Sequence, residues 1–225
     1  MNLDQLAALV EKLRKEAIGE PLWIAGKDVF EYQDHSARVV AILKLIRAMH
    51  GVNAIDLLCR AGFFIDLGVI VRCVNDCISE IYFLLEDFPK TSDNVDRFVT
   101  AFFASTIDGY LSNKEPMVLT KKIRSSVVRV LNGEHDDALR KLLERIFKTF
   151  SGYVHADYAH IMEVYNGAAF DFNVKGVPAI EQRVMRMDHV EVAAISVLYA
   201  AAFIARTLDM TELNQEIMRY VHDFD

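Results

Sequence analysis

The segment VAAISVLYAAAFIA, residues 192–205, contains no charged residue and decides the fold class. Its alanines favour a helix, and apolar side chains would occur on nearly every side of that helix. A surface helix would carry a polar stripe, so we predict that this one lies at the centre of a helical bundle. The segment is too short to cross a bilayer as a helix, and we expect no membrane association.

Outward from this segment, apolar residues recur at helical spacing along most of the chain. Leu6, Leu9, Val10 and Leu13 show the pattern near the N-terminus. All four prolines fall where a helical pattern stops, because proline lacks the backbone N–H that a helix interior needs. Among the expected helices are residues 28–49, 54–61, 64–86, 156–165 and 188–208.

These blocks predict an all-α fold, an antiparallel helical bundle of about eight to nine helices with the alanine-rich C-terminal helix at its centre. Only the region AAFDFNVKGVP, residues 168–178, alternates apolar and polar residues, which predicts a short strand or an extended arm. No long linker or internal repeat interrupts the chain. We therefore expect one helical domain over residues 1–225, in which residues 1–26 could form an N-terminal helical extension.

Composition limits the classes of function. The hydrophobic fraction of 52% predicts either a broad core or an apolar patch used for oligomerisation, and we expect a homodimer. The formal net charge of −7 disfavours binding to nucleic acid, whose phosphates repel an acidic surface. An odd number of cysteines and a charged, amphipathic N-terminus do not suit a secreted protein, so we expect a reducing, bacterial-type cytoplasm.

A charged line on the helix expected at 64–86 is the first candidate site. Arg72, Asp76 and Glu80 stand four residues apart and would share one face, opposite an apolar face. One interpretation is a solvated face with intrahelical ion pairs. The other is that the line faces a polar cavity, where Arg72 would bind an anionic group of a ligand or hold Asp76 in position.

The segment SGYVHADYAHIMEVY, residues 151–165, is the second candidate site. Its catalytic candidates are His155, Asp157 and His160, and Tyr153 and Tyr158 are candidates for ligand binding. On a helix Asp157 and His160 would meet on one face, and such a pair would fix the tautomer of the ring. A hydrogen-bonded structural cluster, a metal-free site and a metal site all stay open. Because the two histidines are poorly phased as co-ligands on one helix, we expect no metal and no cofactor.

Two short motifs carry a resemblance. Gly62 ends a helix before a long helix with Arg72-Cys-Val-Asn-Asp76, and Ser151-Gly-Tyr-Val-His155 follows another helix. The pair resembles a group of uncharacterised bacterial all-helical proteins that are distantly similar to HEPN domains, in layout over residues 30–210. The group often has glutamate where this chain has Asp76. The resemblance implies a helical fold, dimerisation and a role in phage defence or stress.

The ribonuclease motif of HEPN domains is not distinctive in this chain. That motif is an arginine followed by four to six residues and a histidine, and both Arg183 to His189 and Arg129 to His135 fit it. Chance alone predicts about one such match in a chain with this many arginines and histidines. The resemblance therefore does not imply a ribonuclease.

No motif fixes a reaction, since the chain lacks a phosphate-binding glycine loop, an HExxH sequence and a nucleophile elbow. We expect a non-enzymatic, dimeric binding or regulatory module that recognises a small ligand or a protein partner. One alternative is a HEPN-like nuclease or other hydrolase that uses His155 or His160. A second alternative is a metal-dependent helical-bundle enzyme.

Overall fold

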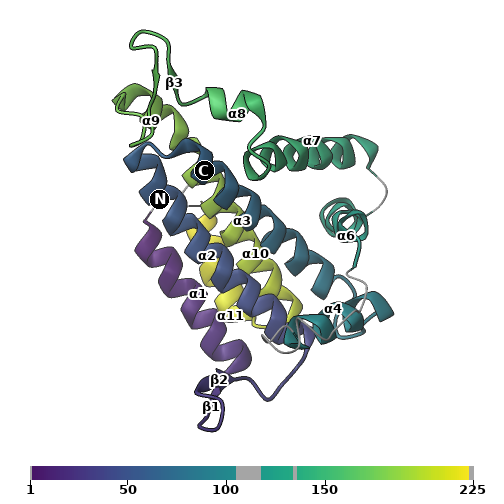
Figure 1. Cartoon of the computed structure of the whole chain (residues 1–225). Coiled ribbons are helices and arrows are strands. Elements are labelled where there is room, and N and C mark those ends of the chain that lie inside the picture. Colours follow the sequence, from purple (N-terminus) through teal and green to yellow (C-terminus); the bar gives the residue numbers. More distant parts are fainter. Residues whose placement is uncertain (1, 105–117, 134–135, 223–225) are drawn as a thin grey trace.

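The computed structural model describes residues 2–104, 118–133 and 136–222, and this part of the chain is mostly helical (Figure 1). The helices are α1 (Leu3–Ile18), α2 (Ala37–Ala61), α3 (Phe64–Leu85), α4 (Asp93–Ala104), α6 (Thr120–Asn132), α7 (Asp137–Val154), α8 (Tyr158–Met162), α9 (Ile180–Arg186), α10 (Asp188–Thr207) and α11 (Thr211–His222). Two short antiparallel hairpins are present, β1 (Leu22–Ile24) with β2 (Val29–Glu31), and β3 (Tyr165–Asn166) with β4 (Asp171–Phe172). The prediction of an all-α bundle is confirmed.

Helix α10 packs against α1, α2, α3 and α11, so the alanine-rich helix is central as predicted. Ala194, Ala200 and Ala205 are fully buried, and their small side chains leave room for close neighbours. The burial is not complete around the helix, however, because Val192, Ile195 and Tyr199 lie on the surface. One apolar stripe of the central helix is therefore exposed.

A single helical stretch of the described residues, Ile180–Thr207, is long and apolar enough to cross a membrane by length and composition. It is longer than the sequence pattern predicts because α9 leads directly into α10. More than half of its most apolar window, 56%, is buried inside the bundle. Core helices of soluble proteins have this property, since their apolar side chains pack on neighbouring helices.

The largest correction concerns α2. The sequence predicts two helices separated at Gly51, but α2 continues through this glycine without a break. A Cβ at Gly51 would lie 2.3 Å from Cγ2 of Val74, so the glycine lets α2 and α3 pack closely. Packing of this kind outweighs the weak intrinsic helix propensity of one glycine.

The chain between α1 and α2 is also misjudged from sequence. Residues 28–36 are predicted to be helical, whereas 22–31 form the hairpin β1–β2. Trp23 and Phe30 face each other across the two strands with ring centroids 4.9 Å apart. Pairing of aromatic residues across strands stabilises such a ribbon, and this pairing depends on the turn rather than on helical spacing.

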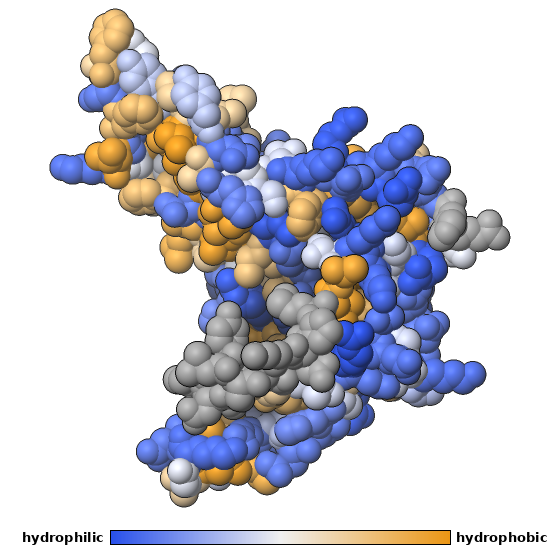
Figure 2. Space-filling model, turned by 45° about the vertical axis from the view of Figure 1, so that its right-hand side comes forward, coloured by the Kyte–Doolittle hydropathy of each residue, from blue (hydrophilic) through white to orange (hydrophobic). Residues whose placement is uncertain are grey.

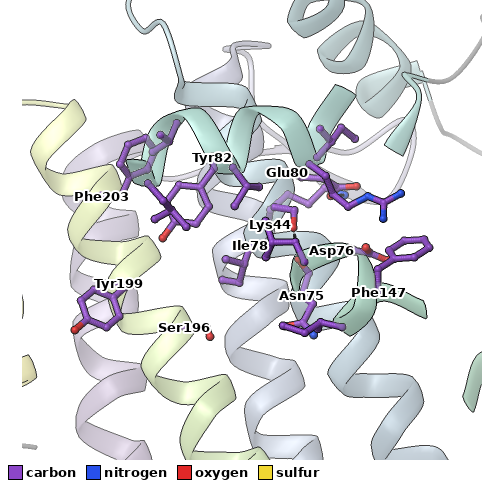
Figure 3. Close-up of a pocket in the computed structure, with 18 of the residues that line it drawn as sticks. Lys44, Asn75, Asp76, Ile78, Glu80, Tyr82, Phe147, Ser196, Tyr199 and Phe203 are labelled. Carbon is purple, nitrogen blue, oxygen red and sulfur yellow. Dashed lines mark hydrogen bonds and ion pairs between the residues drawn. The ribbon is translucent and has the colours of Figure 1, made fainter. Parts of the chain in front are cut away.

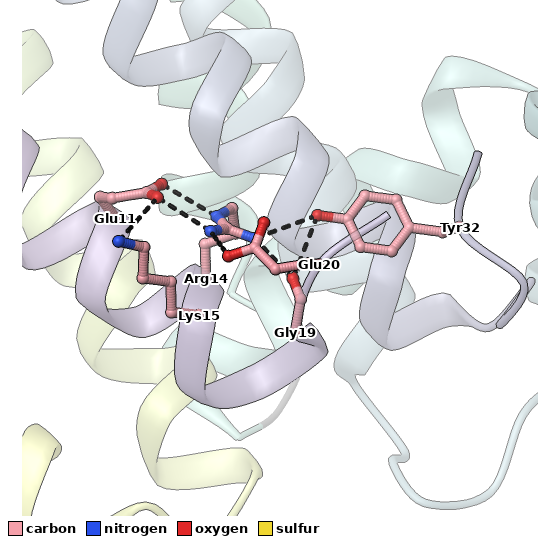
Figure 4. Close-up of polar contacts among 6 residues, drawn as sticks. All are labelled: Glu11, Arg14, Lys15, Gly19, Glu20 and Tyr32. Atoms are coloured by element: carbon pink, nitrogen blue, oxygen red, sulfur yellow. Dashed lines mark hydrogen bonds and ion pairs between the residues drawn. The ribbon is translucent and has the colours of Figure 1, made fainter. Parts of the chain in front are cut away.

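A polar network at the end of α1 ties this hairpin region to the bundle (Figure 4). Arg14 is buried and donates hydrogen bonds to Glu11 at 2.9 Å and to Glu20 at 2.7 Å. It also donates to the backbone oxygen of Gly19 and to the hydroxyl of Tyr32. These acceptors surround the guanidinium, so every part of the buried charge is compensated.

Candidate ligand-binding cavity

A cavity of about 1770 Å³ lies between α3, α4, α6, α7 and α10 (Figure 3). Helix α3 contacts α6, α7 and α10, and it forms the floor. The walls are largely apolar. Their apolar members include Val71, Ile78, Tyr82, Phe98, Phe102, Ile123, Val127, Leu143, Ile146, Phe147, Phe150, Val192, Tyr199 and Phe203.

The charged line of α3 lies on this floor. Arg72 and Asp76 form an ion pair one helical turn apart. Glu80 pairs with Lys44 of α2, whose Nζ is 2.6 Å from Oε2 of the carboxylate. The Arg72 side chain is only 13% exposed and that of Glu80 only 19%, whereas that of Asp76 is 41% exposed. The line therefore faces the cavity, and two of its three charges are shielded from bulk solvent.

The charges on the floor are incompletely compensated. Burial lowers the pKa of Arg72, and the nearby Asp76 carboxylate offsets this only in part. Burial raises the pKa of Asp76 despite Arg72, and burial raises the pKa of Glu80 despite Lys44. In each case desolvation outweighs the opposite charges nearby, which is the situation that an additional charged partner would relieve.

Two arginines hold one aromatic ring of the cavity wall. Cζ of Arg72 lies 3.5 Å from the ring centroid of Phe147, and Cζ of Arg124 lies 4.1 Å from it. Each contact is a cation–π interaction, which also limits the movement of the guanidinium. The edges of both guanidiniums keep donors for a further acceptor.

Basic side chains outnumber acidic ones around the cavity. Among the lining residues that the structure describes, the bases are Lys44, Arg72, Arg97, Arg124 and Arg206, and the acids are Asp76, Glu80 and Asp188. The whole chain has the opposite balance, with a formal net charge of −7. Over the lining residues of the described ranges, the cavity is thus locally basic within an acidic protein, and this balance favours anions.

One histidine lies in the cavity, but it is not among the site candidates named from the sequence. His189 of α10 lines the wall, and its ring meets the edge of Phe150 at a centroid distance of 5.9 Å. Burial lowers the pKa of His189, and Arg186 adds to this effect, so both favour the neutral form of the ring. Its position follows from the helical phase of α10 relative to α7, which sequence spacing does not contain.

The histidine segment folds differently from the prediction. Helix α7 continues through Gly152 to Val154, and the chain then turns at Ala156, whose φ is 54°. The short helix α8 begins at Tyr158, after Asp157 at the N-cap. The predicted helix over 156–165 is therefore wrong at both ends, because a left-handed residue and a cap stop the helical pattern.

His155, Asp157 and Tyr158 are all exposed, whereas the ring of His160 packs against Gly152 and Tyr153. A Cβ on Gly152 would lie 2.2 Å from Cε1 of His160, so only glycine admits the ring. Within the described chain, the predicted Asp157–His160 pair does not form, and Nδ1 of His160 is buried without a hydrogen-bond partner. Oδ2 of Asp157 and the ring of His160 both border Gly152, but no hydrogen bond joins these two side chains.

A hydrogen-bonded cluster occupies this junction instead. The Tyr153 hydroxyl donates to Glu163 at 2.8 Å, and Arg186 of α9 forms an ion pair with the same carboxylate at 2.5 Å. Burial raises the pKa of Tyr153, and the hydrogen bond to Glu163 adds to this effect. The cluster joins α7, the end of α8 and α9. This arrangement matches the structural interpretation of the segment.

The two candidate sites do not meet. Among the described residues, the cavity lining includes Arg72, Asp76 and Glu80, but none of His155, Asp157, His160, Tyr153 and Tyr158. No group of three histidine, cysteine, aspartate or glutamate side chains in the described residues is placed to hold a metal ion. The structure thus separates the charged line from the histidine segment.

Sequence reasoning missed the partners that come from other helices. Lys44 and Phe147 are 36 and 67 residues from Glu80 in the chain, yet they share its cavity. Arg124 is one of four basic residues on α6, and of these only Arg124 lines the cavity, whereas Lys121, Lys122 and Arg129 do not. The position of Arg124 beside the apolar face of α6 was the feature of the sequence that could have indicated its place in the cavity.

Comparison of the chain with protein-family models, with curated proteins and with solved structures gave no match in any of the three. The resemblance to HEPN-like helical proteins therefore stays a prediction. The geometry of the cavity is the basis for the functional argument that follows.

Proposed function

We propose that the protein is a non-enzymatic binding module whose cavity holds an amphipathic, anionic ligand. The ligand's anionic group would lie near Arg72 and Arg124, and its apolar part would lie against the aromatic and aliphatic walls. The resemblance to HEPN-like helical proteins would place such a module in bacterial defence or stress.

The observation that carries the proposal is a basic excess inside an acidic protein, next to apolar walls. A buried guanidinium with one carboxylate partner gains from a second anion, because that anion offsets the remaining desolvation. Ligand sites are typically apolar pockets in which a few polar groups fix the orientation of the ligand. The cavity has this composition.

The size of the cavity supports a ligand larger than a typical metabolite. Sites for drug-sized ligands occupy roughly 300–1,000 Å³, and this cavity is about 1770 Å³. A molecule with a long or multi-ring apolar part would fill more of it. Small inorganic anions would leave the apolar walls hydrated and would bind weakly.

A hydrolase that combines Arg72 with His155 or His160 has less support, because these groups do not share a cavity within the described chain. His155 is exposed and His160 packs against Gly152. General acid–base catalysis requires the acting groups within hydrogen-bond reach of one substrate.

Titration with 8-anilinonaphthalene-1-sulfonate, an aromatic amphipathic anion with environment-sensitive fluorescence, tests the proposal. We expect saturable binding that dodecanoate displaces and that dodecyltrimethylammonium displaces much less. Near-ultraviolet circular dichroism would verify that the protein stays folded throughout the titration. Equal displacement by the anionic and the cationic amphiphile would contradict the proposal, and so would the lack of saturable binding.

Two variants locate the bound probe. Arg72→Gln should weaken probe binding about tenfold, which corresponds to about 1.4 kcal/mol. The matched control is Arg140→Gln, which removes an exposed arginine that pairs with Asp137 and does not line the cavity. The control should leave the affinity unchanged. Equal effects of both variants would show that the probe binds elsewhere.

A further inference from the structure

The exposed stripe of α10 is the most unusual surface of the bundle's central helix. Val192 is 63% exposed, Ile195 40% and Tyr199 45%, although they belong to the helix that supplies much of the core. Their spacing of three and four residues places them on one face of α10. Burial of such a stripe would be favourable, because it removes apolar surface from water.

The stripe has charges of opposite sign at its two ends. Asp188 begins α10 and Arg206 lies in its last turn, and both residues are exposed. Neither side chain forms an ion pair within the described part of the chain. Eighteen residues of helix separate them, a distance of about 27 Å at ~1.5 Å per residue.

We propose that a second copy of this chain packs on the stripe, with its α10 antiparallel to the first. The two-fold axis would pass near Val197. Asp188 would then face the partner's Arg206, and Ile195 would face the partner's Tyr199. The homodimer expected from composition would thus use the exposed stripe of the central helix, which borders the cavity.

Symmetry favours a second copy as the occupant. A two-fold interface uses the same patch on both subunits, so the patch must be complementary to itself. A stripe that is acidic at one end, apolar in the middle and basic at the other meets this condition when two copies run antiparallel. A parallel arrangement would place Asp188 near the partner's Asp188 and is disfavoured.

Exposed apolar surface continues beyond α10. Val184 and Met185 of α9 are 62% and 76% exposed, and Phe170 and Val174, in and after the β3–β4 hairpin, are 82% and 80% exposed. Apolar side chains gather on this projecting arm in Figure 2. A stable dimer buries about 800 Å² on each partner, and α9 would extend the stripe toward that area.

The inference goes beyond the proposed function and does not depend on it. Asp188, Val192, Tyr199 and Arg206 also line the cavity, whereas Ile195 does not, so a second copy would lie along one rim of the cavity. Mass measurements without any ligand test the dimer alone. A failed probe titration would therefore count against ligand binding and not against the dimer. A monomeric mass would count against the dimer and not against ligand binding in the cavity.

Sedimentation equilibrium at micromolar concentration provides the test. We expect a dimeric mass for the wild type and a monomeric mass for Ile195→Glu, which places a charge at the middle of the stripe. A monomeric mass for the wild type would overturn the inference. A dimeric mass for a folded Ile195→Glu protein would also overturn it.

Charge exchange tests the antiparallel arrangement and uses only exposed side chains, so the variants should fold. Asp188→Arg and Arg206→Asp should each weaken dimerisation about tenfold, because each places like charges opposite one another. The double variant should regain most of the wild-type dimer affinity, since the two charges are exchanged at both ends. Additive weakening in the double variant would overturn the antiparallel pairing.

Discussion

Arg14 and Arg72 are two arginines of low exposure with different surroundings, and Figure 4 shows the surroundings of Arg14. Their side chains are 9% and 13% exposed, so both have lost most of their water. Arg14 is surrounded by Glu11, Glu20 and two oxygen acceptors. Arg72 has Asp76, one aromatic ring and an open cavity.

The effect on the guanidinium is opposite at the two places. Hydrogen bonds to Glu11 and Glu20 raise the pKa of Arg14 in spite of burial. Burial lowers the pKa of Arg72 in spite of Asp76. Two arginines of similarly low exposure can therefore belong to a completed structural network or to a site whose charge is incompletely compensated. The number of acceptors around the guanidinium distinguishes the two cases.

Arg14→Met should have the largest effect on stability. Its removal leaves the acceptors around it without their donor, and we expect the free energy of unfolding to fall by about 2 kcal/mol. Urea denaturation would measure the change. Arg140→Met, at an exposed pair, is the control and should change the free energy by less than about 0.5 kcal/mol. Equal effects would mean that the Arg14 network is not structural.

Arg72→Met should cost less stability than Arg14→Met. Because the charge of Arg72 is incompletely compensated, replacing it with an apolar side chain also removes a desolvation cost. We expect a decrease of about 1 kcal/mol or less in the free energy of unfolding. Urea denaturation under the same conditions would measure it. A larger decrease than for Arg14→Met would reverse the comparison.

The pH dependence of stability should differ in sign between the two regions. The pKa of Glu80 is raised above its usual 4.5 by burial, so its contribution is fully present below pH 4.5 and is lost as the pH rises through the folded-state pKa. The pKa of Glu11 is lowered by its hydrogen bond to Arg14, so its contribution is present above pH 4.5 and is lost as the pH falls through the folded-state pKa.

Glu80→Gln and Glu11→Gln separate these two contributions. Relative to each variant, the wild type should lose stability with rising pH in the first case and with falling pH in the second. Urea denaturation from about pH 3 to about pH 7 would measure both differences, because this range extends to both sides of the usual glutamate pKa of 4.5. Slopes of the same sign would contradict the contrast between the cavity and the Arg14 network.

Phe147→Leu should have the smallest effect. It removes the ring that lies between Arg72 and Arg124 but keeps an apolar wall. Each cation–π contact contributes about 0.5–1 kcal/mol, and we expect the anionic probe to bind about threefold more weakly. Fluorescence titration would detect this change. Leu142→Ala on the same helix, which does not line the cavity, is the control and should leave the affinity unchanged.

Local sequence patterns predicted local structure well in the helices that carry the site. The helix over 64–86 is observed as α3, and the four-residue spacing of Arg72, Asp76 and Glu80 places them on one face. The patterns failed where the role of a residue depends on packing against another helix. Gly51 was expected to end a helix, but it admits Val74 instead, and nothing in its local sequence distinguishes the two roles.

In the histidine segment, residues 151–165, closeness in the sequence also failed to predict a shared site. His155, Asp157 and His160 are close in sequence, which suggested a site, but the chain turns at Ala156 and none of the three lines the cavity. One residue in the left-handed conformation changes the direction of the chain, and with it every face assignment downstream. The cavity instead assembles side chains from seven helices, α2, α3, α4, α6, α7, α10 and α11.

The sequence by itself determined the helical class, the central position of residues 192–205 and the common face of the α3 charges. These features follow from the periodicity of side chains within single segments, and that periodicity can be determined from the local sequence alone. Only the tertiary structure decided that Lys44, Arg124 and Phe147 join that face and that α10 leaves an apolar stripe exposed. Those outcomes depend on how helices distant in sequence pack together, which no single segment contains.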